Sequence, residues 1–215
     1  MQKLKGLLKA AHFGPTLIVT AISFGFGTYY WWEGPAYVIA FGVFTGQLVV
    51  GWSNDLYDFD DDLKHQRSKK SLVSGLITKQ YLQKWLRFMV PFSFVANLLG
   101  PLGIKGGSVY MLGIACGVAY NFYFKFSILS PLPYAIAFAA LPSSVAISKD
   151  INPPTWMLLG GALFGMAAHF INVIKDMDQD QASGIKGLPQ RLGKVKSIAA
   201  AAVFIALGIA ALVLF

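Results

Sequence analysis

The sequence predicts an all-α protein whose helices cross a membrane, and three observations lead to this prediction. Hydrophobic residues make up 55% of the 215 positions and charged residues only 13%, whereas soluble domains carry about 25% charged residues. Apolar runs long enough to cross a bilayer follow one another along the chain. Basic residues collect in every second polar stretch between these runs. We expect a single polytopic transmembrane domain over residues 1–215.

Seven apolar runs have the length of a membrane-spanning helix, which is about 20 residues. They lie at residues 14–32, 35–53, 86–104, 107–125, 131–148, 155–174 and 197–215. Glycine and proline recur inside them, which membrane helices tolerate, and small residues let neighbouring helices approach closely. Before the third run, Thr78 is placed to cap a short helix that continues through Trp85 at the membrane interface.

The distribution of basic residues predicts the orientation in the membrane. Sixteen of the eighteen Lys and Arg lie on the side of the N-terminus, and only Lys105 and Lys149 lie on the other side. By the positive-inside rule, the N-terminus and the polar stretches after the second, fourth and sixth runs face the cytoplasm. Because the basic residues flank apolar runs, we assign the net charge of +8 to topology and to anionic lipids, and we expect no nucleic-acid partner.

Five of the ten acidic residues lie within nine positions, 54–62, directly after the second apolar run. If the helix of that run continues, its rotation of about 100° per residue puts Asp55, Asp58 and Asp62 on one narrow face. Asn54 flanks that face. Like charges on one face repel, so the pattern is unfavourable unless a cation lies among them, and such oxygen ligands suit Mg²⁺. The alternative is a solvated acidic end of a membrane helix.

A second acidic cluster follows the sixth apolar run. Asp176 and Asp180 are four residues apart and share a helix face, whereas Asp178 does not. Eight of the ten acidic residues belong to the two clusters, and both clusters lie on the side where positive charge dominates. Chance does not easily place carboxylates at two such matched helix ends, so we expect the two clusters to act together.

Other residues near the clusters are candidates for binding an anion or an aromatic substrate. Tyr120 and Lys125 end the fourth run, where such residues are also common as interface anchors. His169 lies about two turns before Asp176 and points near the same face. A buried histidine in a membrane protein is, however, more often a hydrogen-bond partner between helices than a ligand. The remaining candidate cations are Lys69, Lys70, Lys186 and Arg191.

With both clusters in place, the chain resembles the UbiA superfamily of intramembrane prenyltransferases over nearly its whole length. The family's NDxxDxxxD motif is matched by Asn54, Asp55, Asp58 and Asp62. Its DxxxD motif is matched by Asp176 and Asp180. The stretch from Gly184 to Gly193 is similar to the usual continuation of that second motif, and the pairing of Tyr120 with Lys125 also fits the family.

The sequence departs from the family pattern in two places. Many members carry Arg-Pro in the first loop, where this chain has Lys70 and Ser71. Members usually have nine transmembrane helices, whereas seven apolar runs are present here, so the chain is expected to be short at its C-terminus. The pattern resembles bacterial members of unassigned substrate more than the hydroxybenzoate, menaquinone or chlorophyll branches.

The resemblance implies a Mg²⁺-dependent enzyme of the cell inner membrane with its active site facing the cytoplasm. It would transfer a prenyl group from a polyprenyl diphosphate to an electron-rich aromatic or lipid-precursor acceptor. The two motifs, Asn54 included, would hold Mg²⁺ around the diphosphate, and Tyr120 would stabilise the carbocation or orient the acceptor. The phosphate oxygens would be neutralised by Lys125 with one or more of Lys69, Lys70, Lys186 and Arg191.

Two other functions are compatible with the residues themselves. A cation transporter or channel also carries acidic residues within membrane helices, but it needs some of them near the bilayer centre, where this sequence has almost none. A catalytically inactive relative acting as a membrane scaffold is the third hypothesis.

Overall fold

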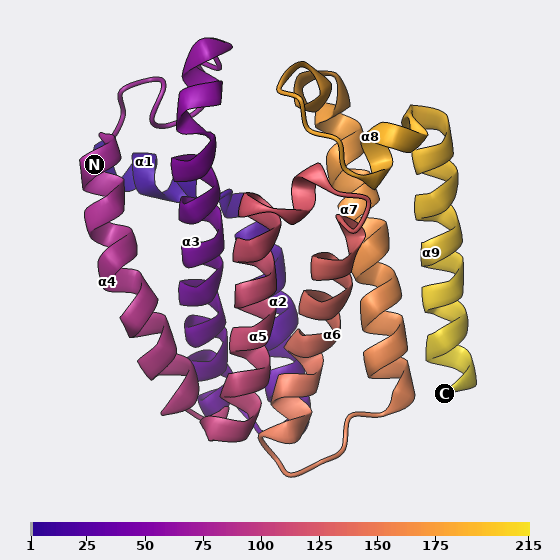
Figure 1. Cartoon of the computed structure of the whole chain (residues 1–215). Helices are drawn as coiled ribbons and strands as arrows, with labels where there is room; N and C mark the ends of the chain where they lie inside the picture. The colour runs from indigo at the N-terminus through magenta and orange to yellow at the C-terminus, as the bar shows by residue number, and fades with distance from the viewer. Residues whose placement is uncertain (1) are drawn as a thin grey trace.

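A computed structural model describes residues 2–215, and every regular element in that range is a helix. The predicted polytopic all-α class is therefore confirmed. Seven long helices pack side by side as a bundle (Figure 1). They are α2 (Phe13–Tyr30), α3 (Glu33–Lys64), α4 (Lys79–Leu98), α5 (Gly103–Phe122), α6 (Pro131–Ile147), α7 (Thr155–Ala182) and α9 (Lys194–Leu214). The short elements are α1 (Gln2–Ala10), the 3₁₀ turn η1 (Phe124–Phe126) and α8 (Leu188–Leu192).

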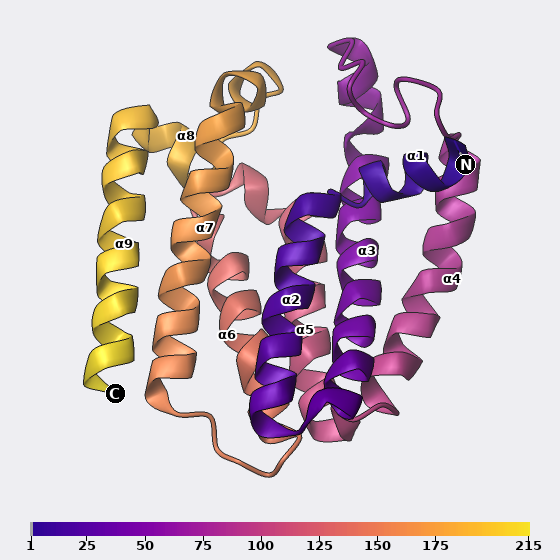
Figure 2. The ribbon, with the colours of Figure 1, turned by 180° about the vertical axis from the view of Figure 1, so that it is seen from behind.

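The helices match membrane spans to different degrees. By length and composition, 3 helices, α3, α7 and α9, are each long and apolar enough to cross a membrane. Helices α1 and α2 meet this test together, although a bend of 71° separates them. Helix α2 lies behind the bundle as drawn in Figure 1, next to α3 and α6 (Figure 2). The seven long helices coincide with the seven predicted runs apart from shifts at their ends.

The largest shift concerns the third run. The predicted short helix at Thr78 and the predicted span 86–104 form the single helix α4, which begins at Lys79 and ends at Leu98. Thr78 acts as the predicted cap, because its hydroxyl accepts a hydrogen bond from the Tyr81 N–H at 3.2 Å. Nothing after this cap breaks the helix until Gly100 and Pro101, which end it six residues earlier than predicted.

Two helices are much longer than a bilayer requires, and they carry the acidic clusters. Helix α3 has 32 residues and α7 has 28, and each runs beyond its apolar part. Their polar ends rise above α5 and α6 at the same end of the molecule (Figure 1). The chain therefore continues as helix through residues 54–62, as the sequence predicts.

Small residues allow the close packing that positions α7. A Cβ atom at Gly165 would lie 2.3 Å from the carbonyl oxygen of Tyr134, and one at Gly161 would lie 2.9 Å from the Cα of Ala139. Both contacts are shorter than real Cβ contacts, so only glycine lets the backbones of α6 and α7 approach this closely. Close packing of α7 on α6 fixes the second acidic cluster relative to the rest of the bundle.

Candidate active site

The aspartates of the first cluster divide by exposure as the helical rotation predicts. Asp55 and Asp62 are buried, with 3% and 2% of their surface exposed, and Asp58 is 21% exposed. Asp60, which points away from this face, is 83% exposed. The three aspartates of the NDxxDxxxD motif therefore face the interior of the bundle at its polar end.

Each of these three carboxylates has a cation beside it. The Lys70 ammonium lies 2.9 Å from Asp55 Oδ1 and 3.8 Å from Asp62 Oδ2, and Lys125 forms an ion pair with Asp58. A buried carboxylate is costly unless it is paired, so the neighbouring basic residues complete the cluster. Burial of the Lys70 ammonium acts to lower its pKa, but the charges of Asp55, Asp62 and Asp58 outweigh this and raise the pKa of Lys70.

Arg67 connects the two acidic helix ends. One of its terminal nitrogens donates to Asp62 Oδ1 at 2.6 Å, at the end of α3. The other donates to the Gln179 carbonyl at 3.2 Å and to the Ser183 hydroxyl at 2.6 Å, at the end of α7. The polar ends of α3 and α7, remote in sequence, therefore lie within the reach of one guanidinium group.

The second cluster is less enclosed than the first. Asp176 is exposed, whereas Asp180 is half-buried and accepts a hydrogen bond from Gln190 Nε2 at 2.9 Å. Gln190 belongs to α8, which lies between α7 and α9 (Figure 1). Asp180 lies beyond the apolar run that ends at Ile174, and burial raises its pKa to about 6, with the charge of Asp176 acting in the same direction. The Gln190 hydrogen bond opposes this rise.

An aromatic group lies below the charged residues, where α5, α6 and α7 meet. The ring of Tyr120 packs edge-on against Tyr134 and His169, at centroid distances of 5.1 Å and 5.4 Å. Tyr120 lies on α5 five residues before Lys125, which pairs with Asp58. His169 is 1% exposed and forms the predicted hydrogen bond between helices, with Nε2 at 3.0 Å from the Ser130 hydroxyl.

The second nitrogen of His169 has no such partner. Its Nδ1 atom is buried, and no described residue forms a hydrogen bond with it. The Ser130 hydroxyl oxygen accepts a hydrogen bond from the Leu188 N–H at 2.9 Å. Among residues 2–215, His169 Nε2 is the only acceptor for the proton of this hydroxyl. When Ser130 donates to Nε2, the ring proton resides on Nδ1, so His169 presents an unpaired N–H donor among the aromatic rings.

Some predicted residues lie at this site and others do not contact it. Lys70, Lys125 and Tyr120 belong to it, and Asn54 is half-buried beside the first cluster. Lys69 and Lys186 are exposed and form no ion pair with any described residue, and exposed Arg191 donates to the Lys186 carbonyl at 2.8 Å. The functional roles of all these residues stay predictions.

Three residues at the site were not singled out from the sequence. Arg67 lies five residues after Asp62, and this short spacing could have indicated an ion pair between them. Gln190 lies in the stretch after the second motif. His12 lies in the bend between α1 and α2, with Nε2 3.5 Å from Asp55 Oδ1. Its position depends on the 71° bend, which no sequence pattern indicates.

The donor set suits a hard divalent cation. Within residues 2–215, no three His, Cys, Asp or Glu side chains converge as a complete metal site. Mg²⁺ does not require one, because it is commonly held by one or two carboxylates, waters and substrate phosphates. The carboxylates that pair with Lys70, Arg67 and Lys125 are hard oxygen ligands of the kind that suits Mg²⁺. The residues present therefore fit Mg²⁺ bound together with a phosphate ligand.

Solved structures share this fold at low sequence identity. A UbiA homolog from Archaeoglobus fulgidus bound to DMAPP and Mg²⁺ matches with a TM-score of 0.80 at 16% identity, over 96% of this chain and 76% of that one. The same homolog bound to GPP and Mg²⁺ gives a TM-score of 0.79 at 16% identity, with the same coverage of 96% and 76%. The structure of a digeranylgeranylglyceryl phosphate synthase gives 0.69 at 18% identity, over 98% of this chain and 76% of that one.

Sequence comparison identifies the family of this chain but no individual curated relative. No curated protein matches the chain. The model of the UbiA prenyltransferase family, by contrast, matches residues 12–215, which include both aspartate clusters and all seven long helices. With this match, with the shared helical fold and with both motifs at one end of the bundle, the chain belongs to the UbiA prenyltransferase family.

Proposed function

We propose that this protein is a prenyltransferase that uses Mg²⁺ to transfer the prenyl group of a prenyl diphosphate to an electron-rich aromatic or lipid-precursor acceptor. The observation that carries the proposal is the link through Arg67, which contacts the aspartate-bearing ends of both α3 and α7. Relatives of this fold bind DMAPP or GPP with Mg²⁺, which supports the same donor class here. We place the site at the cytoplasmic face of the cell inner membrane, as the basic residues indicate.

The charged end of the site is suited to a diphosphate. When bound, Mg²⁺ would supply positive charge that offsets the charge growing on the leaving diphosphate. We assign its ligands to the two motifs, at Asn54, Asp55, Asp58, Asp62, Asp176 and Asp180. Lys70, Arg67 and Lys125 pair with these carboxylates, so we also assign them as the cations close enough to bind phosphate oxygens of the donor.

The aromatic end of the site is suited to the prenyl cation and its acceptor. The rings of Tyr120 and Tyr134 offer π faces to a cationic carbon, and the surrounding apolar helices exclude water that would capture it. In the tautomer with the proton on Nδ1, we assign to His169 a hydrogen bond from this nitrogen to an oxygen of the acceptor, since Nδ1 is buried and no residue in 2–215 bonds to it. An acceptor with a hydroxyl or carbonyl oxygen next to its nucleophilic atom satisfies this arrangement.

The test uses the full chain in detergent and an isotope-labelled prenyl diphosphate. We expect retention of the donor with Mg²⁺ and its loss when EDTA removes the metal. Incubation with a total lipid extract and an aromatic-acid mixture is expected to yield a labelled product. Donor binding that is indifferent to Mg²⁺, or absent with it, would overturn the proposal, whereas Mg²⁺-dependent transport of an ion without transfer would favour the transporter alternative.

A further inference from the structure

Helix α1 lies across the bundle instead of along it, and its position is fixed from one side. It meets α2 at an angle of 71°. Gly6, Leu7 and Ala10 are buried against the rest of the chain. Trp52 on α3 donates from Nε1 to the Leu7 carbonyl at 2.9 Å, and a Cβ at Gly6 would lie 2.6 Å from Ile77 Cγ2. This packing holds α1 across the bundle at 71° to α2, as for a helix that lies in the membrane interface.

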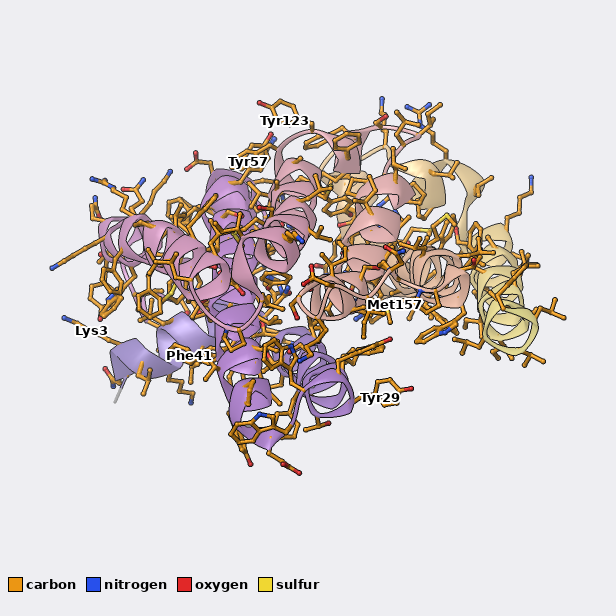
Figure 3. All side chains as sticks on the ribbon, turned by 90° about the horizontal axis from the view of Figure 1, so that it is seen from below. Lys3, Tyr29, Phe41, Tyr57, Tyr123 and Met157 are labelled. Atoms are coloured by element: carbon orange, nitrogen blue, oxygen red, sulfur yellow. The ribbon has the colours of Figure 1, made fainter. Side chains whose placement is uncertain are left out.

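The free side of α1 combines an apolar groove with two unpaired cations. The groove is lined by Leu4, Leu8 and Phe13 together with Lys5 and Lys9. Leu4 is 62% exposed and Phe13 is 38% exposed. Lys5 and Lys9 are one helical turn apart, and no described carboxylate lies within 4.0 Å of either. In Figure 3, α1 lies at the outer edge of the bundle, with the labelled Lys3 pointing outward.

We propose that this groove binds an anionic phospholipid, with the phosphate on Lys5 and Lys9 and an acyl chain along Leu4, Leu8 and Phe13. Leu4 and Leu8 are four residues apart, and so are the lysines, so the helix presents an apolar stripe and a basic stripe side by side. A phospholipid has the same division between charged headgroup and apolar chain. A free phosphate ion would satisfy the lysines but would leave the leucines and Phe13 exposed to water.

Several other basic residues at this end of the molecule have partners within the described chain. Lys70, Arg67 and Lys125 pair with aspartates, and Lys3 lies over the ring of Tyr81 at 5.2 Å. Lys5 and Lys9 therefore contribute positive charge that no described protein group neutralises. The proposal stands apart from the catalytic function, because in the described structure no groove residue forms an ion pair with an aspartate of either cluster.

Native mass spectrometry of the full chain in detergent tests the site. The protein is titrated with dioleoylphosphatidylglycerol, which is anionic, or with dioleoylphosphatidylcholine, which is zwitterionic. We expect the first phosphatidylglycerol to bind more tightly than the first phosphatidylcholine. The double variant Lys5→Gln/Lys9→Gln is expected to lose this preference, at about fivefold for each charge removed. The double variant Leu4→Ser/Leu8→Ser is expected to weaken the binding of both lipids.

The matched control is Lys194→Gln/Lys196→Gln, which removes two exposed cations from the start of α9 at the same end of the bundle. We expect it to bind phosphatidylglycerol as the unmodified protein does. An equal loss in this control would reduce the effect to net charge and overturn the proposal. Displacement of phosphatidylglycerol by millimolar inorganic phosphate, with no effect of the serine variant, would identify a plain anion site instead and would also overturn it.

Discussion

Neighbouring aspartates on one helix end have opposite surroundings in this protein. Asp58 faces inward and pairs with Lys125, whereas Asp60, two residues away, is 83% exposed and lies 3.5 Å from Lys79. Rotation along α3 alone accounts for this difference, because two residues correspond to about 200° around the axis. Function at this helix end should therefore depend on the position of each carboxylate and not on the total charge.

We expect Asp58→Asn to lower Mg²⁺-dependent transfer by at least about 100-fold, because it removes a charge that acts on the leaving diphosphate. Asp60→Asn removes the same charge from the outer face, and its activity is expected to stay within about twofold of the unmodified protein, as for surface pairs of little energetic weight. Initial rates with a labelled prenyl diphosphate measure both. Equal losses in the two variants would contradict the assignment of the helix face.

Gln190 offers a test of the second cluster. Gln190→Leu keeps much of the side-chain volume but removes the hydrogen bond to Asp180, and we expect the apparent affinity for Mg²⁺ to fall roughly 10-fold, as for other groups that orient metal ligands. The control is Gln179→Leu, because that side chain is exposed and Arg67 contacts only its backbone carbonyl. Titration of donor binding with Mg²⁺ measures the change. An unchanged midpoint of the Mg²⁺ titration in Gln190→Leu would contradict a role of Asp180 as a metal ligand.

The sequence predicted which aspartates share a face and gave Lys70 and Lys125 among the candidate cations, but it did not single out Arg67. Helical geometry is local, so spacing alone places Asp55, Asp58 and Asp62. Lys70 and Arg67 lie in the irregular segment after α3 and Lys125 lies in η1, where tertiary contacts decide the chain path. Arg67 is held there by Asp62 and by α7, while Lys69, equally plausible from its spacing, points outward.

Among the secondary-structure elements, α3 and α7 define the site because both continue beyond the apolar part of the bundle. The lengths of these two helices could be predicted from the apolar runs and the acidic spacing together. The ends of α4 could not be predicted, since hydropathy marks the apolar part of a helix and not its capped polar start. Helix α1 was missed as a separate element because a basic start before an apolar run carries no signal for a bend.

The contact between α6 and α7 gives a prediction about stability. Gly165→Ala would place a Cβ 2.3 Å from the Tyr134 carbonyl oxygen, so we expect a loss of about 1–3 kcal/mol as the helices separate. Gly25→Ala is the matched control, because no atom lies within 4 Å of a Cβ there and alanine favours a helix more than glycine does. Thermal unfolding in detergent compares the two. A melting temperature unchanged by Gly165→Ala would show that α7 is free to shift.

At the scale of the whole molecule, the fold groups the charged residues at the ends of the bundle as the sequence predicted. Helices α3 and α7 bring both acidic clusters to one end of the bundle, and the same end collects most of the basic residues. The opposite end holds Lys105 and Asp150, which form an exposed ion pair at 2.6 Å. Positive charge resists translocation during membrane insertion, so the end with the clusters should remain in the cytoplasm.

Cysteine labelling in intact cells tests this orientation. Cys116→Ser first removes the native thiol, and single cysteines are then placed at exposed positions on opposite ends, Ser74→Cys near the clusters and Ile151→Cys beside Asp150. We expect a membrane-impermeant maleimide to label Ile151→Cys in intact cells, and to label Ser74→Cys only after the membrane is opened. The reverse pattern would place the aspartates outside the cytoplasm, where a donor made in the cell could not reach them directly.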